Sequence, residues 1–202
     1  MPLKSADRRA DAPLVEVRPV TDVSGLLSLI AAKDEEISRL RNFVDAFLPV
    51  DIDTGLLNRN GTIEAIRRAW AWWNRRREPF GVMAVVIPAI EKLSADDAAN
   101  VARMVSIALS DAGRAVDDMG RLDPITFVVV LREFHRHGAP TVVSRMRTTL
   151  RHAIADPAIT SEIKFGMVVA VEGDGAQPED YLESAVEAAR EAESEIPNFA
   201  EV

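Results

Sequence analysis

The chain contains no cysteine, which excludes a disulfide framework and any metal site built on thiolate ligands. Its longest apolar run, Val82 to Ile87, is too short to cross a bilayer, and the amino terminus lacks the apolar core of a signal peptide. Positive charge is scarce as well, because 24 Lys and Arg residues stand against 32 Asp and Glu residues, for a net charge of -8. That balance argues against binding nucleic acid through general attraction to phosphate. We therefore expect a cytoplasmic protein with no membrane insertion and no nucleic-acid partner.

The chain is long enough for one hydrophobic core and an appendage, since 48% of its 202 residues are apolar and 28% are charged. Residues 1–21 contain Pro2, Pro13 and Pro19 among scattered charges, and their apolar residues follow no period. Such a segment buries too little apolar surface to fold, so we expect a disordered tail there.

Residues 22–49 are predicted to form a dimerising coiled-coil helix that ends at Pro49, because the residue before a proline is pushed out of the α region. Apolar residues follow the alternating spacing of four heptads, and only Lys33 interrupts it. The seam consists of Val23, Leu26, Ile30, Ile37, Leu40, Val44 and Phe47. A single amphipathic helix lying on the domain is the simpler interpretation. The β-branched residues that open each heptad favour a parallel homodimer through residues 22–47.

Beyond Pro49, helical and strand patterns alternate along the chain. Helices are expected after Arg59, from about Asp96 to Ala112, from Pro140 and from Pro178. Buried strands are expected at Val82–Ile87 and at Ile163–Val171, which ends in a turn at residues 173–175, with a β-hairpin at Arg114–Leu131 that turns at Asp123 and Pro124. These elements predict an α/β fold in which a mixed central sheet is flanked by helices.

The helical patterns also predict which side chains face the core. On the helix after Arg59, Trp70 and Trp73 fall on the apolar stripe with Ile63 and Ile66, whereas Trp72 lies off it and is expected to be exposed. On the helix that ends at Ala112, the residues expected to face inward are Val101, Val105, Ile107 and Ala108.

The segment Asp51–Arg59 reads Asp-Ile-Asp-Thr-Gly-Leu-Leu-Asn-Arg and is similar to DxLTGLxNR, the entry motif of the GGDEF domain family. Members of that family are bacterial diguanylate cyclases, which join two GTP molecules into cyclic di-GMP. The strand at Val82–Ile87, the strand at Phe127–Leu131 and the segment Lys164–Met167 stand where the family has its first strand, the strand after its signature and its Ser-hydrophobic-Gly-Val strand. The resemblance implies that residues 50–202 form a degenerate GGDEF-like domain with the nucleotidyl-cyclase-like fold. A coiled-coil helix that leads into the entry motif is also common in this family.

The signature itself is lost, because Gly-Gly-Asp/Glu-Glu-Phe is replaced by Asp-Pro-Ile-Thr-Phe at residues 123–127. The resemblance places Val86 and Ile125 where cyclases have the carboxylates that bind two divalent metals, and neither side chain offers an oxygen ligand. Asp123 and Pro124 replace the paired glycines, so one repels phosphate and the other has no N–H to donate. Glu193 stands in place of a phosphate-binding lysine. We therefore expect no catalytic residues, no metal site, no cofactor and no enzyme activity.

A second site of the family is retained. Its inhibitory product site carries Arg-x-x-Asp ahead of the signature, and Arg114 and Asp117 stand at that spacing, while Arg145 falls where the family places a further arginine. A guanidinium can fork onto guanine O6 and N7 or onto phosphate, and a carboxylate accepts from the N–H edge of guanine. Taken alone, the motif could equally be a surface ion pair. With the resemblance, it predicts that Arg114, Asp117 and Arg145 bind cyclic di-GMP.

Together these observations favour a catalytically inactive GGDEF-like domain that acts as a cyclic di-GMP receptor and signals to a downstream protein partner through a coiled-coil homodimer. One alternative is a ligand-independent protein-interaction or dimerisation module with a vestigial nucleotide site. A residual enzyme acting on a nucleotide is a further alternative. Binding of cyclic di-GMP distinguishes the first two, and turnover of GTP tests the third.

Overall fold

The computed structural model describes residues 23–171, 175–193 and 197–200. The predicted tail at residues 1–21 and most of the predicted turn at residues 173–175 lie outside these ranges. The chain divides into two units, Met1–Arg41 and Asn42–Val202, which are described separately. None of the helices in the described ranges is both long and apolar enough to span a membrane.

The helix α1, Val23–Phe47, carries the predicted seam. Val23, Leu26, Ile30, Ile37 and Leu40 are each between 43% and 65% exposed. Val44 and Phe47 complete the seam, but their side chains lie outside those described. A helix with so many exposed apolar residues at heptad spacing matches the sequence pattern for a coiled coil, and the homodimer stays a prediction.

A mixed five-stranded sheet forms the centre of the second unit, in the order β2-β3-β1-β4-β5. Its strands are β1 (Phe80–Val86), β2 (Asp118–Arg121), β3 (Thr126–Arg132), β4 (Lys164–Val169) and β5 (Asn198–Ala200). All neighbouring pairs are antiparallel except β4 and β5. The predicted β-hairpin is therefore present as β2 and β3, and the short edge strand β5 had no signal in the sequence.

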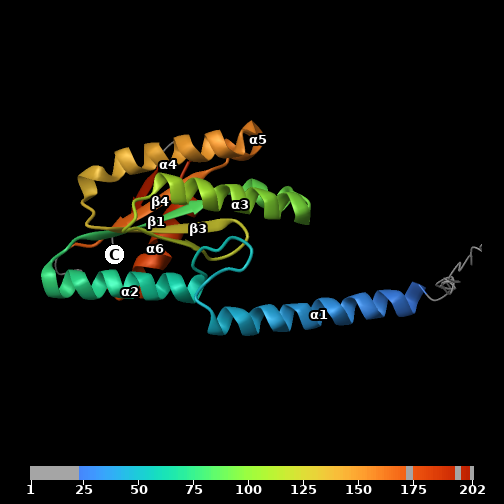
Figure 1. The fold of residues 1–202 in the computed structure, drawn as a ribbon. Coiled ribbons are helices and arrows are strands. Elements are labelled where there is room, and N and C mark those ends of the chain that lie inside the picture. Colours follow the sequence, from blue (N-terminus) through green and yellow to red (C-terminus); the bar gives the residue numbers. More distant parts are fainter. Residues whose placement is uncertain (1–22, 172–174, 194–196, 201–202) are drawn as a thin grey trace, which may run out of the picture. The chain divides into compact units, whose positions relative to one another are not determined.

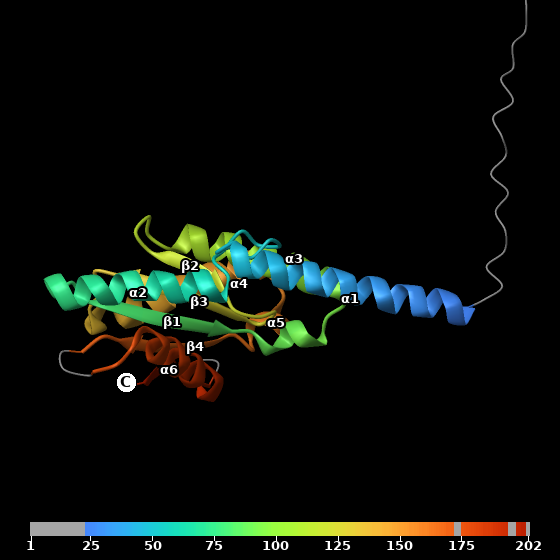
Figure 2. The same ribbon diagram turned by 90° about the horizontal axis from the view of Figure 1, so that it is seen from below.

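Helices cover both faces of this sheet (Figure 1). The helices α3 (Ala95–Ala112) and α4 (Ala139–Ile154) lie on one face, and α2 (Arg59–Arg76) and α6 (Pro178–Glu191) lie on the other, as the view from below in Figure 2 also shows. Alternate residues of β1 serve the two cores: Met83 and Val85 pack toward α3 and α4, and Val82, Ala84 and Val86 pack in the other core. Every residue of β1 is buried, which explains why its sequence is uniformly apolar.

Three short helical segments complete the described part: η1 (Pro88–Lys92), η2 (Arg136–Gly138) and α5 (Pro157–Thr160). The mixed sheet flanked by helices confirms the predicted fold class. The helix α6 begins at Pro178 as predicted, and α4 begins at Ala139, one residue before the predicted Pro140.

The prediction that Ile107 faces the core is wrong, because its side chain is 61% exposed. The buried stripe of α3 runs through Val101, Val105, Ala108 and Ala112, at helical spacing, and Ile107 lies on the opposite side of that helix. On α2, Trp70 and Trp73 are partly buried against the core, and Trp72 is 41% exposed, as the stripe predicted.

Candidate functional site

The entry motif forms a tight loop that is fixed by its first residue. The Asp51 carboxylate accepts hydrogen bonds from the Thr54 amide at 2.9 Å and from the Thr54 hydroxyl at 2.6 Å. Gly55 follows with φ of 72°, a left-handed conformation that favours glycine, and its N–H donates to the Asp51 carbonyl at 2.8 Å. The Asp51 carboxylate also forms an ion pair with the guanidinium of Arg121 on β2, at 3.4 Å.

The same loop is tied to the hairpin and starts α2. The Leu57 amide donates to the Met119 carbonyl at 2.9 Å, and the Arg121 amide donates to the Leu57 carbonyl at 2.7 Å. Asn58 is the N-cap of α2, because its side-chain oxygen accepts from the Gly61 amide at 2.9 Å. These contacts explain the Asp, Gly and Asn of the motif by local geometry, and they fix where the hairpin lies against α2.

The turn of the hairpin is closed by its own side chain. One oxygen of the Asp123 carboxylate accepts from the Ile125 amide at 3.0 Å and from the Thr126 amide at 2.9 Å, and the Leu122 amide donates to the Thr126 carbonyl at 2.9 Å. This is the local hydrogen bonding by which Asp stabilises turns. Two amides of the turn are therefore occupied by a carboxylate of the chain itself, and Pro124 has no amide proton to offer.

Apolar side chains stand beside this turn at the two positions predicted to lack metal ligands. Val86, the last residue of β1, is 2% exposed, and Ile125 is a half-buried residue that packs against both cores. Val86 is paired with Thr126 across the sheet, and the Ile87 amide donates to the Ile125 carbonyl at 2.9 Å. Among the described residues, no group of three or more His, Asp or Glu side chains is placed to hold a metal ion.

A groove of about 430 Å³ runs between this turn and α6. Its apolar lining is Leu122, Leu182 and Val186, and its charged lining is Arg59, Asp123, Glu183, Glu187, Arg190 and Glu191. Acidic residues outnumber basic ones, so this groove disfavours a polyphosphate. Glu193, predicted to replace a lysine, is exposed just beyond the end of α6.

Arg114 and Asp117 meet in a compact turn between α3 and β2. The Asp117 carboxylate accepts from the Arg114 amide at 2.9 Å and from its guanidinium at 3.2 and 3.3 Å. It also accepts from the Arg132 amide at 3.3 Å, and the Arg114 guanidinium donates to the Arg132 carbonyl at 2.7 Å. The Asp117 side chain is 0% exposed and that of Arg114 is 43% exposed. The Arg114–Asp117 pair is therefore hydrogen-bonded to the backbone at the end of β3, and of its two side chains only that of Arg114 is exposed to solvent.

The third predicted residue, Arg145, lies on the exposed side of α4 in an open hollow of about 570 Å³. Four hydroxyl-bearing residues, Thr141, Ser144, Thr148 and Thr149, line the same hollow. Within the described residues, the Arg145 guanidinium has no hydrogen-bond or ion-pair partner, so no bond joins it to Arg114 or Asp117. The helix α4, which carries Arg145, lies on the same face of the sheet as α3, and the chain enters the Arg114–Asp117 turn at the end of α3 (Figure 1).

Sequence reasoning missed the burial of Asp117. The available signal was the position of Asp117 directly before a strand and three residues after Arg114, a spacing that allows an Asp to cap a turn. No pattern in the sequence indicated that the carboxylate contacts Arg132, because this contact depends on the register of β2 against β3.

Comparison with known proteins places this geometry in a family. The family model described as diguanylate cyclase, GGDEF domain, matches residues 49–198. A comparison with curated proteins finds no significant match. Among solved structures, the chain is similar to diguanylate cyclase SiaD of Pseudomonas aeruginosa, solved with its activator SiaC, at 18% identity and a TM-score of 0.65, over 88% of this chain and 72% of that one.

Two further structures are similar at low identity. The GGDEF domain of DgcB from Caulobacter crescentus, solved in complex with c-di-GMP, gives 13% identity and a TM-score of 0.63, over 75% of this chain and 95% of that one. The GGDEF domain of FimX from Pseudomonas aeruginosa gives 14% identity and a TM-score of 0.62, over 77% and 99%. At such identities the structures establish a common fold, and the match to the family model over most of the chain establishes more: the chain belongs to the GGDEF domain family.

Proposed function

We propose that this protein is a cyclic di-GMP receptor that has lost diguanylate cyclase activity. The observation that carries the proposal is the contrast between the two ends of one hairpin. At the turn, Asp123 occupies the Ile125 and Thr126 amides. At the root, the Arg114 guanidinium is held in place and is still 43% exposed. In this proposal the turn has lost its backbone donors for phosphate, and the root has kept an exposed guanidinium for the ligand.

Loss of catalysis follows from charge and coordination. Two magnesium ions and a triphosphate need carboxylate ligands and backbone donors. Val86 and Ile125 supply no oxygen, and the turn amides already have an acceptor. Within the described part of the chain, the adjoining groove is lined by four acidic residues and by two basic ones, Arg59 and Arg190. Each difference opposes a bound nucleoside triphosphate.

Binding of the cyclic dinucleotide is proposed at Arg114, with Asp117 and Arg145. The Arg114 guanidinium, which is 43% exposed, can fork onto O6 and N7 of a guanine once Nε and Nη2 leave Asp117 and the Arg132 carbonyl. For Asp117 to accept from the N–H edge of the same guanine, the Arg114 side chain has to turn away from the carboxylate that it now covers. Arg145, whose guanidinium has no partner among the described residues, is proposed to meet a phosphate or a second base. The GGDEF domain of DgcB, which shares the fold, was solved with c-di-GMP.

The proposed signalling unit is a homodimer through α1. Its seam residues are exposed over the described part of the helix. A second copy of the chain carries the same heptad pattern, so its apolar seam would match this one in a parallel pair. A change in the GGDEF domain is proposed to reach a downstream protein through this helix.

Calorimetric titration with cyclic di-GMP tests the receptor function. The wild-type protein is expected to bind, and Arg114→Ala is expected to weaken binding about ten- to a hundredfold, since a forked arginine–guanine contact contributes roughly 1 to 3 kcal/mol. Arg145→Ala should act in the same direction. GTP should not compete.

Arg103→Ala is the matched control, because Arg103 is another exposed arginine of the same helical layer, bound only to Asn100 at 2.8 Å among the described residues. The Arg103→Ala variant should bind cyclic di-GMP with the same affinity as the wild type. If the wild-type protein does not bind, or if the Arg114 variant binds equally well, the ligand-independent interaction module replaces the receptor as the proposed function.

A further inference from the structure

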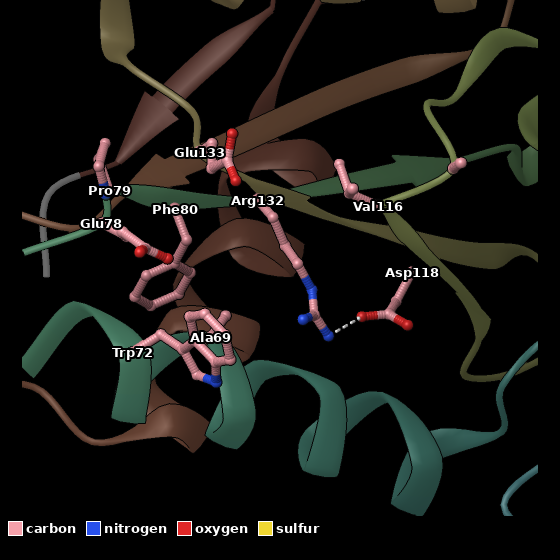
Figure 3. A pocket seen from close by; sticks show the side chains of 10 residues that line it. Ala69, Trp72, Glu78, Pro79, Phe80, Val116, Asp118, Arg132 and Glu133 are labelled. Carbon is pink, nitrogen blue, oxygen red and sulfur yellow. Dashed lines mark hydrogen bonds and ion pairs between the residues drawn. The ribbon is translucent and has the colours of Figure 1, made fainter. Parts of the chain in front are cut away.

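A cavity of about 390 Å³ lies between α2 and the ends of β1, β2 and β3 (Figure 3). It is lined by Ala69, Trp72, Glu78, Pro79, Phe80, Ala115, Val116, Asp118, Arg132 and Glu133. Its size falls in the range of pockets that hold small organic ligands. It is separate from the groove beside the signature turn and shares no lining residue with it.

The walls of this cavity, the α2 pocket, present apolar and aromatic surface. Trp72 and Ala69 come from α2 on one side, and Phe80 lies at the start of β1 (Figure 3). Trp72 is 41% exposed and Val116 is 47% exposed. A half-exposed indole beside a buried phenyl ring offers a flat group both stacking and apolar contact.

The charged groups of the pocket leave negative charge uncompensated. Arg132 donates to Asp118 at 2.7 Å, and Arg68 approaches the same carboxylate at 3.8 Å. Among the residues that the structure describes, Glu78 has only a long ion pair, 3.7 Å from Arg76. Glu133 has no hydrogen-bond or ion-pair partner within the described residues. Its carboxylate lies on the opposite side of the pocket from Trp72 (Figure 3). A cation that enters the pocket would therefore meet the carboxylates of Glu78 and Glu133, neither of which has a close partner among the described residues.

The chain itself shows which chemistry suits the indole. The guanidinium carbon of Arg76 lies 4.5 Å from the ring centroid of Trp72, a cation–π distance, while the Arg76 side chain is 64% exposed. Because that side chain is so exposed and its ion pair with Glu78 is long, Arg76 can be displaced at little cost. Arg76 does not itself line the pocket, and a planar cation from outside could stack on the pocket side of the indole and compete with Arg76 for Glu78.

We propose that the α2 pocket binds a flat organic cation, an amidinium or guanidinium carried on an apolar body. The cation stacks on the pocket side of Trp72, competes with Arg76 for Glu78, and is paired by Glu78 and Glu133. A carboxylate or phosphate ligand is disfavoured, because Arg132 is committed to Asp118 and the remaining charges repel it. None of Arg114, Asp117 and Arg145 lines this pocket, so the inference does not rest on the proposed receptor function.

Benzamidine, a flat amidinium on a phenyl ring, is the probe. The test is a titration of the whole chain followed by the indole N–H resonances in a nitrogen-15 correlation spectrum. The Trp72 resonance, assigned by its loss in Trp72→Phe, should shift saturably. The Trp70 resonance should not move, because its indole N–H is bound to the Ala176 carbonyl at 2.9 Å, outside the pocket. Benzoate, the anion of the same shape, should give no saturable shift.

Two variants, each with a matched control, sharpen the test. Glu133→Gln should weaken benzamidine binding about three- to fivefold, the size of one exposed charge contact, whereas Glu64→Gln, another exposed glutamate but paired with Arg67, should leave it unchanged. Arg76→Ala should strengthen binding, because it removes the competing guanidinium. Arg75→Ala is its control, because it removes the same charge from a side chain that is bound to the Ala71 carbonyl and not to Trp72.

Several results would overturn the inference. One is the absence of a saturable Trp72 shift up to about 10 mM benzamidine, ten times the roughly 1 mM Kd of a weak small ligand. Equal binding of benzoate is another. The third is equal strengthening by Arg75→Ala and Arg76→Ala, which would show a general charge effect rather than competition with Arg76 for Trp72 and Glu78.

Discussion

Replacing Asp117 by alanine should destabilise the domain far more than replacing its partner Arg114. The Asp117 carboxylate is fully buried and accepts from two backbone amides, those of Arg114 at 2.9 Å and Arg132 at 3.3 Å. Its loss leaves two amides without an acceptor at the junction of α3, β2 and β3. An unsatisfied buried amide costs about 1 to 3 kcal/mol, so the two together, partly reached by water, should cost roughly 2 to 4 kcal/mol.

Arg114→Ala removes different bonds. The guanidinium is 43% exposed, so its ion pair with Asp117 contributes at most about 1 kcal/mol, and the bond to the Arg132 carbonyl contributes a similar amount at most. The two carboxylate–amide bonds survive this change. Arg114→Ala is therefore the cleaner probe of the proposed ligand binding, because Asp117→Ala would combine any loss of proposed ligand contacts with a loosened hairpin.

Urea unfolding followed by circular dichroism measures this difference, as a shift in midpoint at unchanged slope. The matched control is Asp111→Ala, because Asp111 is exposed on α3 and its side chain has no bond within the described residues. It should change the free energy of unfolding by less than about 0.5 kcal/mol. If Asp117→Ala cost no more than Arg114→Ala, the carboxylate would not be holding the turn, and its proposed structural role would be refuted.

Two further predictions concern catalysis and assembly. The purified protein should form no cyclic di-GMP from GTP with magnesium or manganese, as measured by chromatography of the products. The double variant Val86→Asp with Ile125→Asp should not restore activity, because Asp123 still occupies the turn amides. Product formed by the wild type and abolished by mutation within residues 123–126 would contradict this prediction. Ile30→Asp with Ile37→Asp should convert a dimer into a monomer in light scattering, since facing charges in a desolvated seam cost several kcal/mol. Ser28→Asp with Ser38→Asp adds the same charge off the seam and should leave the dimer intact, and a dimer that survived the seam variant would place the contact in the GGDEF domain.

Much of this fold could be predicted from sequence, because its strongest signals are local. The uniformly apolar β1 and the β-branched β3 are buried on both faces and read as strands without their neighbours. The helix α4 shows its apolar stripe and an early proline. Ile107 was misplaced because it is apolar and next in sequence to the buried Ala108, although helical spacing puts it on the other side of α3. The strand β5 has only three half-buried residues and depends on pairing with β4.

The candidate site could be predicted as a set of residues but not as a geometry. Spacing alone identifies Arg114 and Asp117 as neighbours, since residues three apart in a turn can meet. The burial of Asp117 depends on Arg132, which is distant in sequence and is brought in by strand register. The α2 pocket had no sequence signal either, because Trp72 on α2 and Glu133 just after β3 are far apart in the chain and are brought together only by packing.

Two aspartates, Asp123 at the turn and Asp117 at the root, use the same chemistry with opposite consequences for a ligand. Each accepts from two backbone amides and so fixes one end of the hairpin. At the turn the captured amides are unavailable to a phosphate, which agrees with the proposed loss of catalysis. At the root the carboxylate holds Arg114 with its guanidinium 43% exposed, as the proposed receptor site requires. About six residues of extended chain separate the two, roughly 20 Å, far enough for changes at either end to act independently. The proposed loss of the nucleotide turn is therefore compatible with an intact structure around Arg114.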